Sequence, residues 1–257
     1  MHNDAEGEGE SQVGRGQALG GIWRAWGKRP FRFGLFAAAQ LIVLTVTGML
    51  LYPGGTVADP ESPGYDFFRN FFSDLGRTVS PGGEPNTASA LLFFVALTVA
   101  GLGLASYFVA ALQFFWQGRL LRVLGFLGAV AGLASGLSFV GVALTPANLR
   151  LGAHGWFVGM AFRTFLAAVL FHLAAILLHR LYPKVYAAVY GVFAALLAAY
   201  LWLLFEGPRP GTTAGVTIQA TGQKIIVYAA LLCVLVQSYG TMRLYEAQAN
   251  AAENRGG

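Results

Sequence analysis

The chain alternates between long apolar runs and short polar connections. Six runs contain about 20 residues or more, at residues 33–52, 87–115, 121–144, 154–181, 185–205 and 222–245. A helix needs about 20 apolar residues to cross the roughly 30 Å of hydrocarbon in a bilayer. The pattern therefore predicts an all-α, polytopic membrane protein with six transmembrane helices.

The connection between the first two runs, residues 53–86, is the longest and has its own pattern. It begins with the turn-rich segment PGGTVADPESPG and continues with YDFFRNFFSDLG. In the second segment, apolar residues recur at helical spacing: Phe67, Phe68, Phe71, Phe72 and Leu75. That segment is too short to span a membrane and too apolar for water, so we expect a short helix lying in the outer interface.

Composition supports a membrane location. The chain is 56% hydrophobic and 11% charged, whereas about 25% of residues are charged in a typical soluble domain. The net charge of +5 does not indicate a nucleic-acid partner, because most basic residues lie near the ends of the predicted helices. The single cysteine, Cys233, lies within an apolar run, which excludes an intrachain disulfide and a cysteine-based metal site. We expect no metal and no cofactor.

The basic residues also predict an orientation. Eleven of the 17 Lys and Arg residues fall on one side of the six runs, before the first, in the two short hairpins, and after the last. Cytoplasmic connections carry this excess, so both termini are expected in the cytoplasm. We divide the chain into a disordered tail (1–28), a transmembrane domain (29–246) and a short C-terminal tail (247–257).

Ionisable residues at membrane depth indicate functional sites by default. The fourth run carries His154, Arg163 and His172 at intervals of nine residues, so Arg163 points opposite to the two histidines. About 27 Å along the helix separates the histidines, which excludes a shared metal site. We interpret His172 as a hydrogen-bonded interhelical residue. Arg163 either pairs with Asp74 or Glu206 to fix helix register, or binds a lipid phosphate or carboxylate.

Several polar residues are predicted at the same outer depth. They either converge on one pocket or form an ordinary ring of interfacial charges. They are Asp74, Arg77, Asn86, His154, Glu206 and Lys224.

Small residues mark a packing face on the third run. Gly128, Gly132 and Gly136 recur every four residues, and Gly125 extends the ridge. Such spacing lets helices approach closely in lipid. The ridge is expected to pack against another helix, either of this chain or of a second copy or partner subunit.

The segment SDLG at 73–76, followed by Asn86 before the second run, resembles a motif of a known membrane family. The family is the bacterial group called domain of unknown function 998, with a more distant likeness to the DRAM/Sfk six-helix proteins. Pro146 and His154 are similar to the family's Pro-then-His segment, and TGQKIIV resembles its start of the last helix. Lys224 stands there in place of the more usual Arg, which keeps the charge but loses the bidentate fork.

The resemblance covers residues 33–245 and implies a six-helix bundle with an outward-facing polar cluster. It implies little about activity. Asn86, Arg163, Glu206 and Lys224 are the candidate ligand-binding residues of that cluster.

Three functions fit these patterns. The first is a membrane protein that binds a lipid or a partner subunit without catalysis. The second is a lipid hydrolase or transferase, in which Ser73 or a water is the nucleophile, His154 the base and Asp74 the orienting group. It requires the His154 ring within hydrogen-bond reach of Ser73 or Asp74, directly or through one water. The third, a small transporter, ranks last because no broken helix or inverted repeat is evident.

Overall fold

A computed structural model describes residues 27–256, and this part of the chain is helical, with no strand. The long helices are α2 (Arg29–Leu50), α3 (Thr87–Ala111), α4 (Arg119–Ala143), α5 (Leu151–Leu178), α6 (Lys184–Glu206) and α7 (Thr213–Gly256). The short 3-10 helices are η1 (Phe72–Gly76) and η2 (Leu112–Phe115). All six long helices are long and apolar enough to span a membrane, which confirms the predicted fold class.

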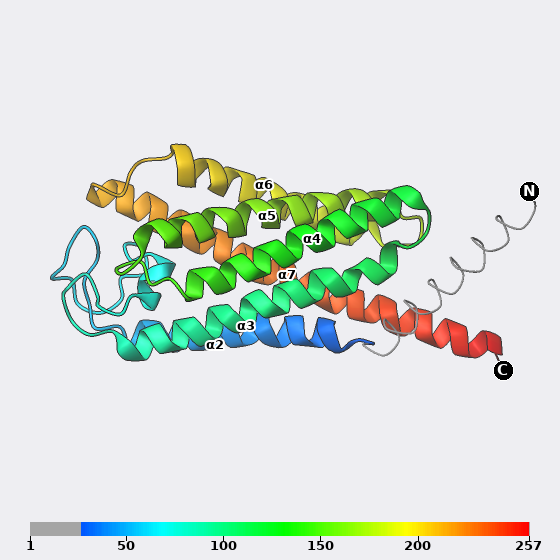
Figure 1. Cartoon of the computed structure of the whole chain (residues 1–257), viewed down its shortest axis with the longest axis horizontal. Helices are drawn as coiled ribbons and strands as arrows, with labels where there is room; N and C mark the ends of the chain where they lie inside the picture. The colour runs from blue at the N-terminus through cyan, green and yellow to red at the C-terminus, as the bar shows by residue number, and fades with distance from the viewer. Residues whose placement is uncertain (1–26, 257) are drawn as a thin grey trace, which may run out of the picture.

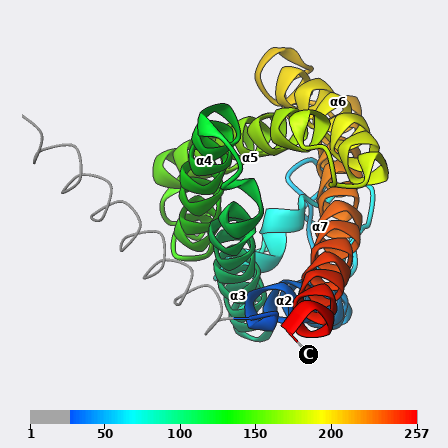
Figure 2. The same ribbon diagram turned by 90° about the vertical axis from the view of Figure 1, so that its right-hand side faces the viewer.

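The six helices form a closed ring when viewed end-on (Figure 2). Each packs against its neighbours in the chain, and α7 returns to pack against both α6 and α2. One end of the bundle carries the connection 53–86, and we call it the loop end (Figure 1). The opposite end carries the short connections 112–118 and 179–183, and we call it the hairpin end.

Local sequence explains where the helices begin and end. Pro30 lies in the first turn of α2 and Pro183 immediately precedes α6, two positions where proline costs no helical hydrogen bond. The sixth helix begins earlier than the predicted start at residue 222. It begins at Thr213, and Thr212 caps its first turn. The Thr212 carbonyl accepts the Val216 N–H at 2.9 Å, and the Thr212 hydroxyl accepts the Gly215 N–H at 3.1 Å. The extra turns place Gln219 against the end of α6, where it donates to the Leu203 carbonyl at 2.8 Å.

The predicted domain limits shift slightly. Residues 1–26 lie outside the described part, so the predicted disorder of 1–28 concerns mostly residues that are not described. Lys28 belongs to the bundle, since its Nζ pairs with Glu246 of α7 at 2.7 Å. The helix α7 continues from there to Gly256, so secondary structure does not change at the predicted boundary of 246.

The glycine ridge of α4 packs inside the chain. An added Cβ on Gly128 would overlap the His172 ring of α5, and one on Gly132 would overlap the Phe108 ring of α3. Gly136 meets the backbone of Gly101 in the same way. The prediction of close helix packing is therefore confirmed. The suggested use of this ridge as an interface between copies is corrected, because neighbouring helices of the same chain already cover it.

Aromatic side chains fill the hairpin half of the ring. Buried rings from α2, α3, α5 and α6 belong to the largest core cluster, among them Phe31, Tyr107, Phe108, Phe165 and Tyr190. The Tyr107 and Tyr190 hydroxyls hydrogen-bond to each other at 3.1 Å within it. Small residues lie nearer the middle of the ring, among them Ala37 and Ala38 of α2, Ala100 of α3 and Ala230 of α7.

Candidate functional site

The connection 53–86 folds into a compact cap on the loop end. Gly55 has a φ of 87° and lies against the backbone of Gly82, an approach that a side chain at position 55 would prevent. The Gly55 N–H also donates to the Ser62 carbonyl at 2.8 Å. The turn-rich composition therefore encodes a folded structure.

The expected interfacial helix is present in a shorter form. The helix η1 contains only Phe72–Gly76, and residues 67–69 form a turn. The apolar residues therefore divide: Phe72 and Leu75 are buried, whereas Phe67 and Phe68 are exposed. The structure inserts the second half of the segment into the ring and leaves the first half on its surface.

Asp74 shapes the backbone of this inserted segment. Its Oδ2 accepts the N–H of Phe71 at 2.8 Å and so caps η1. Its other oxygen lies 4.0 Å from Nη1 of Arg77, a long ion pair with a partly exposed arginine. The sequence suggested Arg163 as an ion-pair partner of this carboxylate, or His154 as its neighbour in a catalytic trio. The nearest cation is instead Arg77, which follows it by one turn.

Asn70 connects the inserted segment to the rest of the cap. The side chain is fully buried, and its Nδ2 donates to the Gly55 carbonyl at 2.8 Å and to Asp74 Oδ2 at 3.3 Å. Its Oδ1 accepts the N–H of Asp66 at 2.8 Å. The Asn70 amide thus links Gly55, Asp66 and Asp74, which lie in three parts of the connection.

Two residues of α7 hold the inserted segment from below. Gln223 Oε1 accepts the Phe72 N–H at 2.6 Å. Lys224 is buried, and its ammonium donates to the backbone carbonyl of Asn70. The rings of Tyr65 and Phe67 lie 5.3 and 5.2 Å from the same ammonium, within the range of cation–π attraction.

Residues of α3 hold the segment from the other side. Asn86 Nδ2 donates to the carbonyls of Arg77 and Leu75 at 2.9 and 3.2 Å. The Ser89 hydroxyl donates to the same Leu75 carbonyl at 3.2 Å. Asn86 therefore fixes the backbone of the inserted segment, independently of any contact with a ligand. We call residues 71–76, held in this way, the plug.

Burial sets the electrostatics beneath the cap. It raises the pKa of the Asp74 carboxyl above its ordinary value, and the hydrogen bonds from Asn70 and Phe71 and the charges of Arg77 and Lys224 offset only part of this effect. Burial likewise raises the pKa of the Tyr52 and Tyr65 hydroxyls. The cluster is polar but largely removed from water.

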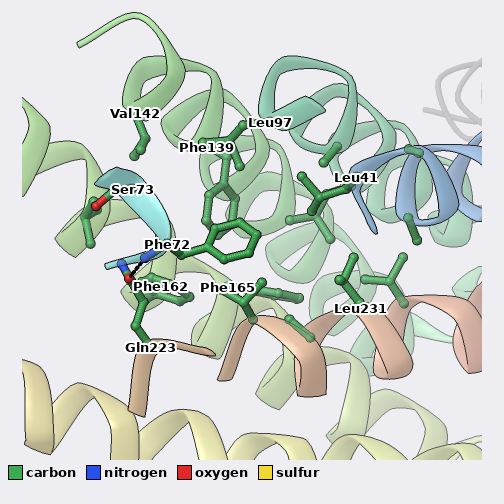
Figure 3. A pocket seen from close by; sticks show the side chains of 18 of the residues that line it. Leu41, Phe72, Ser73, Leu97, Phe139, Val142, Phe162, Phe165, Gln223 and Leu231 are labelled. Atoms are coloured by element: carbon green, nitrogen blue, oxygen red, sulfur yellow. Dashed lines mark hydrogen bonds between the residues drawn. The ribbon is translucent and has the colours of Figure 1, made fainter. Parts of the chain in front are cut away.

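A narrow apolar cavity of ≈ 100 Å³ lies under the plug, inside the helix ring (Figure 3). Phe72, Ser73 and Gln223 lie together at one end of it, and Leu41 and Leu231 lie further along. Small residues leave the space open, among them Gly34, Ala37, Ala38, Ala100 and Ala230. Phe139, Phe162 and Phe165 line the opposite wall.

The three candidate catalytic residues are not joined by hydrogen bonds. His154 is buried, and its Nδ1–H donates to the Thr145 carbonyl at 2.7 Å. Its Nε2 is buried without a partner in the described residues. Neither Ser73 nor Asp74 bonds to the ring directly, so a catalytic role for this trio stays a prediction. No three His, Cys, Asp or Glu side chains of the described residues are grouped to hold a metal.

Arg163 and Glu206 do not join the cluster beneath the cap. Arg163 is exposed on the outer surface of α5, and its guanidinium stacks on the Phe205 ring at 4.0 Å. It lies in no ion pair among the described residues. Glu206 is exposed at the end of α6, in a groove that Arg209 and Phe71 of the plug also line. No hydrogen bond or ion pair of the described residues joins Arg163 or Glu206 to the polar cluster beneath the cap.

Two residues central to the site, Asn70 and Gln223, were absent from the predicted site residues. Asn70 precedes Asp74 by four residues, a spacing that brings two side chains together on one turn, so a local signal existed. Gln223 was visible at the start of the last run but lies 151 positions from Phe72, and no local pattern predicts that contact. No sequence pattern predicted that the alanines of α2, α3 and α7 would line a cavity either.

Comparisons with protein-family models, with curated proteins and with solved structures found no match to this chain.

Proposed function

We propose that this membrane protein binds a lipid, holding one apolar chain of it in the cavity beneath the plug, without catalysing a reaction. The observation that supports this most is the cavity itself, an apolar space lined mainly by membrane-spanning helices. Apolar cavities exclude water and take up apolar ligands of matching size.

The dimensions of the cavity favour a linear chain. Its lining on α7 extends from Gln223 to Val234, about 16 Å at 1.5 Å per residue. A volume of ≈ 100 Å³ spread over that length is narrow. It is smaller than a cavity of about 150 Å³ that accepts a benzene ring, so as it stands it holds a short alkyl segment. A longer acyl chain enters when the plug or the lining side chains move, and a flexible linear chain needs less displacement of them than fused rings do.

The plug closes the cavity on the side that carries the polar cluster. The backbone of Phe72 is fixed by Gln223, and its ring lies over the cavity. A ligand chain enters after the plug moves or through a gap between helices in the membrane. Lipid binding therefore assigns a role to the SDLG segment that needs no catalytic chemistry.

We also propose the orientation and location that the basic residues predict. The hairpin end, with Arg119, Arg122, Arg180 and Lys184, faces the cytoplasm, and the plug faces the opposite side. The bacterial inner membrane follows only from the resemblance to domain of unknown function 998. Membership of that family stays a prediction.

The test compares two neighbouring alanines of α2. Ala38 lines the cavity and is buried, whereas Ala39 is exposed on the outer face. Ala38→Phe fills the cavity, and Ala39→Phe adds the same ring outside it. Native mass spectrometry of the purified variants is expected to show co-purified lipid on the wild type and Ala39→Phe, and at least tenfold less on Ala38→Phe.

Equal lipid on the two folded variants, or none on the wild type after gentle extraction, would contradict the proposed function. Thermal unfolding of each variant provides the control for folding. Ala230→Leu, a smaller intrusion from α7, replaces Ala38→Phe if that variant does not fold.

A further inference from the structure

Two polar groups at the loop end of the apolar cavity have no hydrogen-bond partner in the described chain. They are the hydroxyl of Ser73 and the Nε2 amide of Gln223, and both residues line the cavity (Figure 3). The remaining lining residues are alkyl, aromatic or glycine. The polarity of the cavity is thus concentrated at one end.

The orientation of the Gln223 amide is fixed by the plug. Its Oε1 accepts the Phe72 N–H at 2.6 Å, so this oxygen cannot be exchanged with Nε2 without losing that bond. Nε2 then carries two N–H donors, and no described residue accepts from them. This nitrogen is not among the fully buried polar atoms, so part of its surface is accessible and open volume lies beside it. An unused donor in apolar surroundings is unfavourable, and an acceptor atom of a ligand removes that penalty.

We propose that the ligand is an acyl compound whose carbonyl oxygen accepts hydrogen bonds from Gln223 Nε2 and Ser73 Oγ, with its alkyl chain directed toward the hairpin end. This inference rests on the proposed lipid binding and adds the chemical class and orientation of the ligand. A free carboxylic acid and an acyl ester both present such an oxygen.

The surroundings of the two ends favour this orientation. The buried ammonium of Lys224, the residue after Gln223, donates to the Asn70 carbonyl and does not line the cavity, so it favours a negatively charged oxygen at the polar end only at longer range. At the other end, the lining residues Gly34, Leu104 and Val234 offer only apolar surface. The alkyl chain therefore matches the hairpin end, and the carbonyl matches the loop end.

The binding test separates the carbonyl contact from the apolar one. Purified, delipidated protein is titrated with dodecanoic acid, methyl dodecanoate and dodecane, and bound ligand is measured by native mass spectrometry. Gln223→Glu keeps an oxygen for the Phe72 N–H but removes the amide donors. It is expected to bind the acid and the ester about three- to tenfold more weakly, the value of one lost hydrogen bond, and dodecane unchanged.

Ser73→Ala provides the second variant, because it removes the hydroxyl without touching a bond that holds the plug. It is expected to weaken binding of the acid and the ester in the same way. Hydrogen exchange at the Phe72 amide shows whether the plug stays docked in each variant. Tighter binding of the acid than of the ester by the wild type identifies a free carboxylic acid as the source of the carbonyl. Tighter binding of the ester identifies an acyl ester.

A photoreactive probe tests the orientation. Dodecanoic acid with a diazirine at its terminal carbon is expected to label peptides around Gly34 and Val234, rather than the connection 53–86. Labelling confined to the plug would show the reverse orientation and overturn the inference.

The two proposals fail in different ways. If all three compounds bind equally to the wild type, to Gln223→Glu and to Ser73→Ala, while Ala38→Phe blocks them, the cavity binds chains but the carbonyl inference is wrong. If no compound binds and Ala38→Phe changes nothing, the proposed function itself is wrong.

Discussion

Buried polar side chains in and around the cap hydrogen-bond mainly to backbone groups. Asn70, Asn86, Gln223 and Lys224 each bind a carbonyl or an N–H of the connection 53–86. Buried backbone groups without partners are costly, so side chains replace the missing secondary structure here. The Ser-Asp pair follows the same logic, since Asp74 caps the short helix in which it lies.

The raised pKa of Asp74 predicts a pH dependence with a definite sign. Below the ordinary value of 3.8, the carboxyl is neutral whether the protein is folded or unfolded. As the pH rises above that value, the unfolded chain ionises first, so the folded state loses stability until its own, higher pKa is passed. Relative to Asp74→Asn, which does not titrate, the wild type is expected to lose thermal stability between pH 4 and the raised pKa.

Thermal unfolding in detergent at stepped pH measures this difference between the wild type and Asp74→Asn. A wild type that instead gains stability over Asp74→Asn as the pH rises would show that the hydrogen bonds and cations around the carboxylate outweigh its burial.

Removing the amide of Asn70 is expected to release the cap. Asn70→Ala leaves the Gly55 carbonyl and the Asp66 N–H without partners, at a cost of about 1–3 kcal/mol in the free energy of unfolding. Hydrogen exchange across residues 53–86 should rise with it. Glu84→Ala, an exposed substitution in the same connection, is the control and should change neither quantity. Unchanged exchange in Asn70→Ala would contradict the role given to this residue.

At the scale of elements, small residues decide how closely the helices approach. The ridge of α4 accepts rings from two neighbours: Phe108 meets Gly132, and His172 meets Gly128. The sequence predicted this packing from the spacing alone. It did not predict the partners, because an i, i+4 pattern marks a face and carries no information about what covers it.

Two glycine substitutions separate packing from helix propensity. In Gly132→Ala, the new methyl group meets the buried Phe108 ring, so overpacking of about 1–3 kcal/mol is expected to outweigh the gain in helix propensity. In Gly191→Ala of α6, nothing lies within 4 Å of the added Cβ, so stability should be unchanged or up to about 1 kcal/mol higher. Equal melting temperatures of the two variants would argue against tight packing on this ridge.

At the scale of the whole molecule, the charge distribution predicts which end faces the cytoplasm. In a background of Cys233→Ala, Glu61→Cys places an exposed thiol on the cap and Arg180→Cys places one at the hairpin end. A membrane-impermeant maleimide added to intact cells is expected to label Glu61→Cys and spare Arg180→Cys. Labelling of Arg180→Cys alone would reverse the proposed orientation.

The ring closed by α7 brings together the groups of the candidate site. Phe72 and Gln223 lie far apart in the chain, and they meet because the last helix packs beside the first. The same closure leaves a space that neither the plug nor the surrounding helices fill. The nine-residue spacing on α5 placed Arg163 opposite His154 and His172, and the structure shows the two histidines buried and Arg163 facing outward.

The sequence by itself determined the number of helices, their approximate limits, the packing face of α4 and a folded connection after the first helix. These features depend on local composition and on a spacing of a few residues, which a single helix or turn obeys wherever it lies. Tertiary structure alone decided that Gln223 binds the Phe72 backbone, that Lys224 binds a backbone carbonyl, and that a cavity lies under Phe72. Each of these depends on the rotation and closure of the helix ring, which the chain sets through contacts between distant residues.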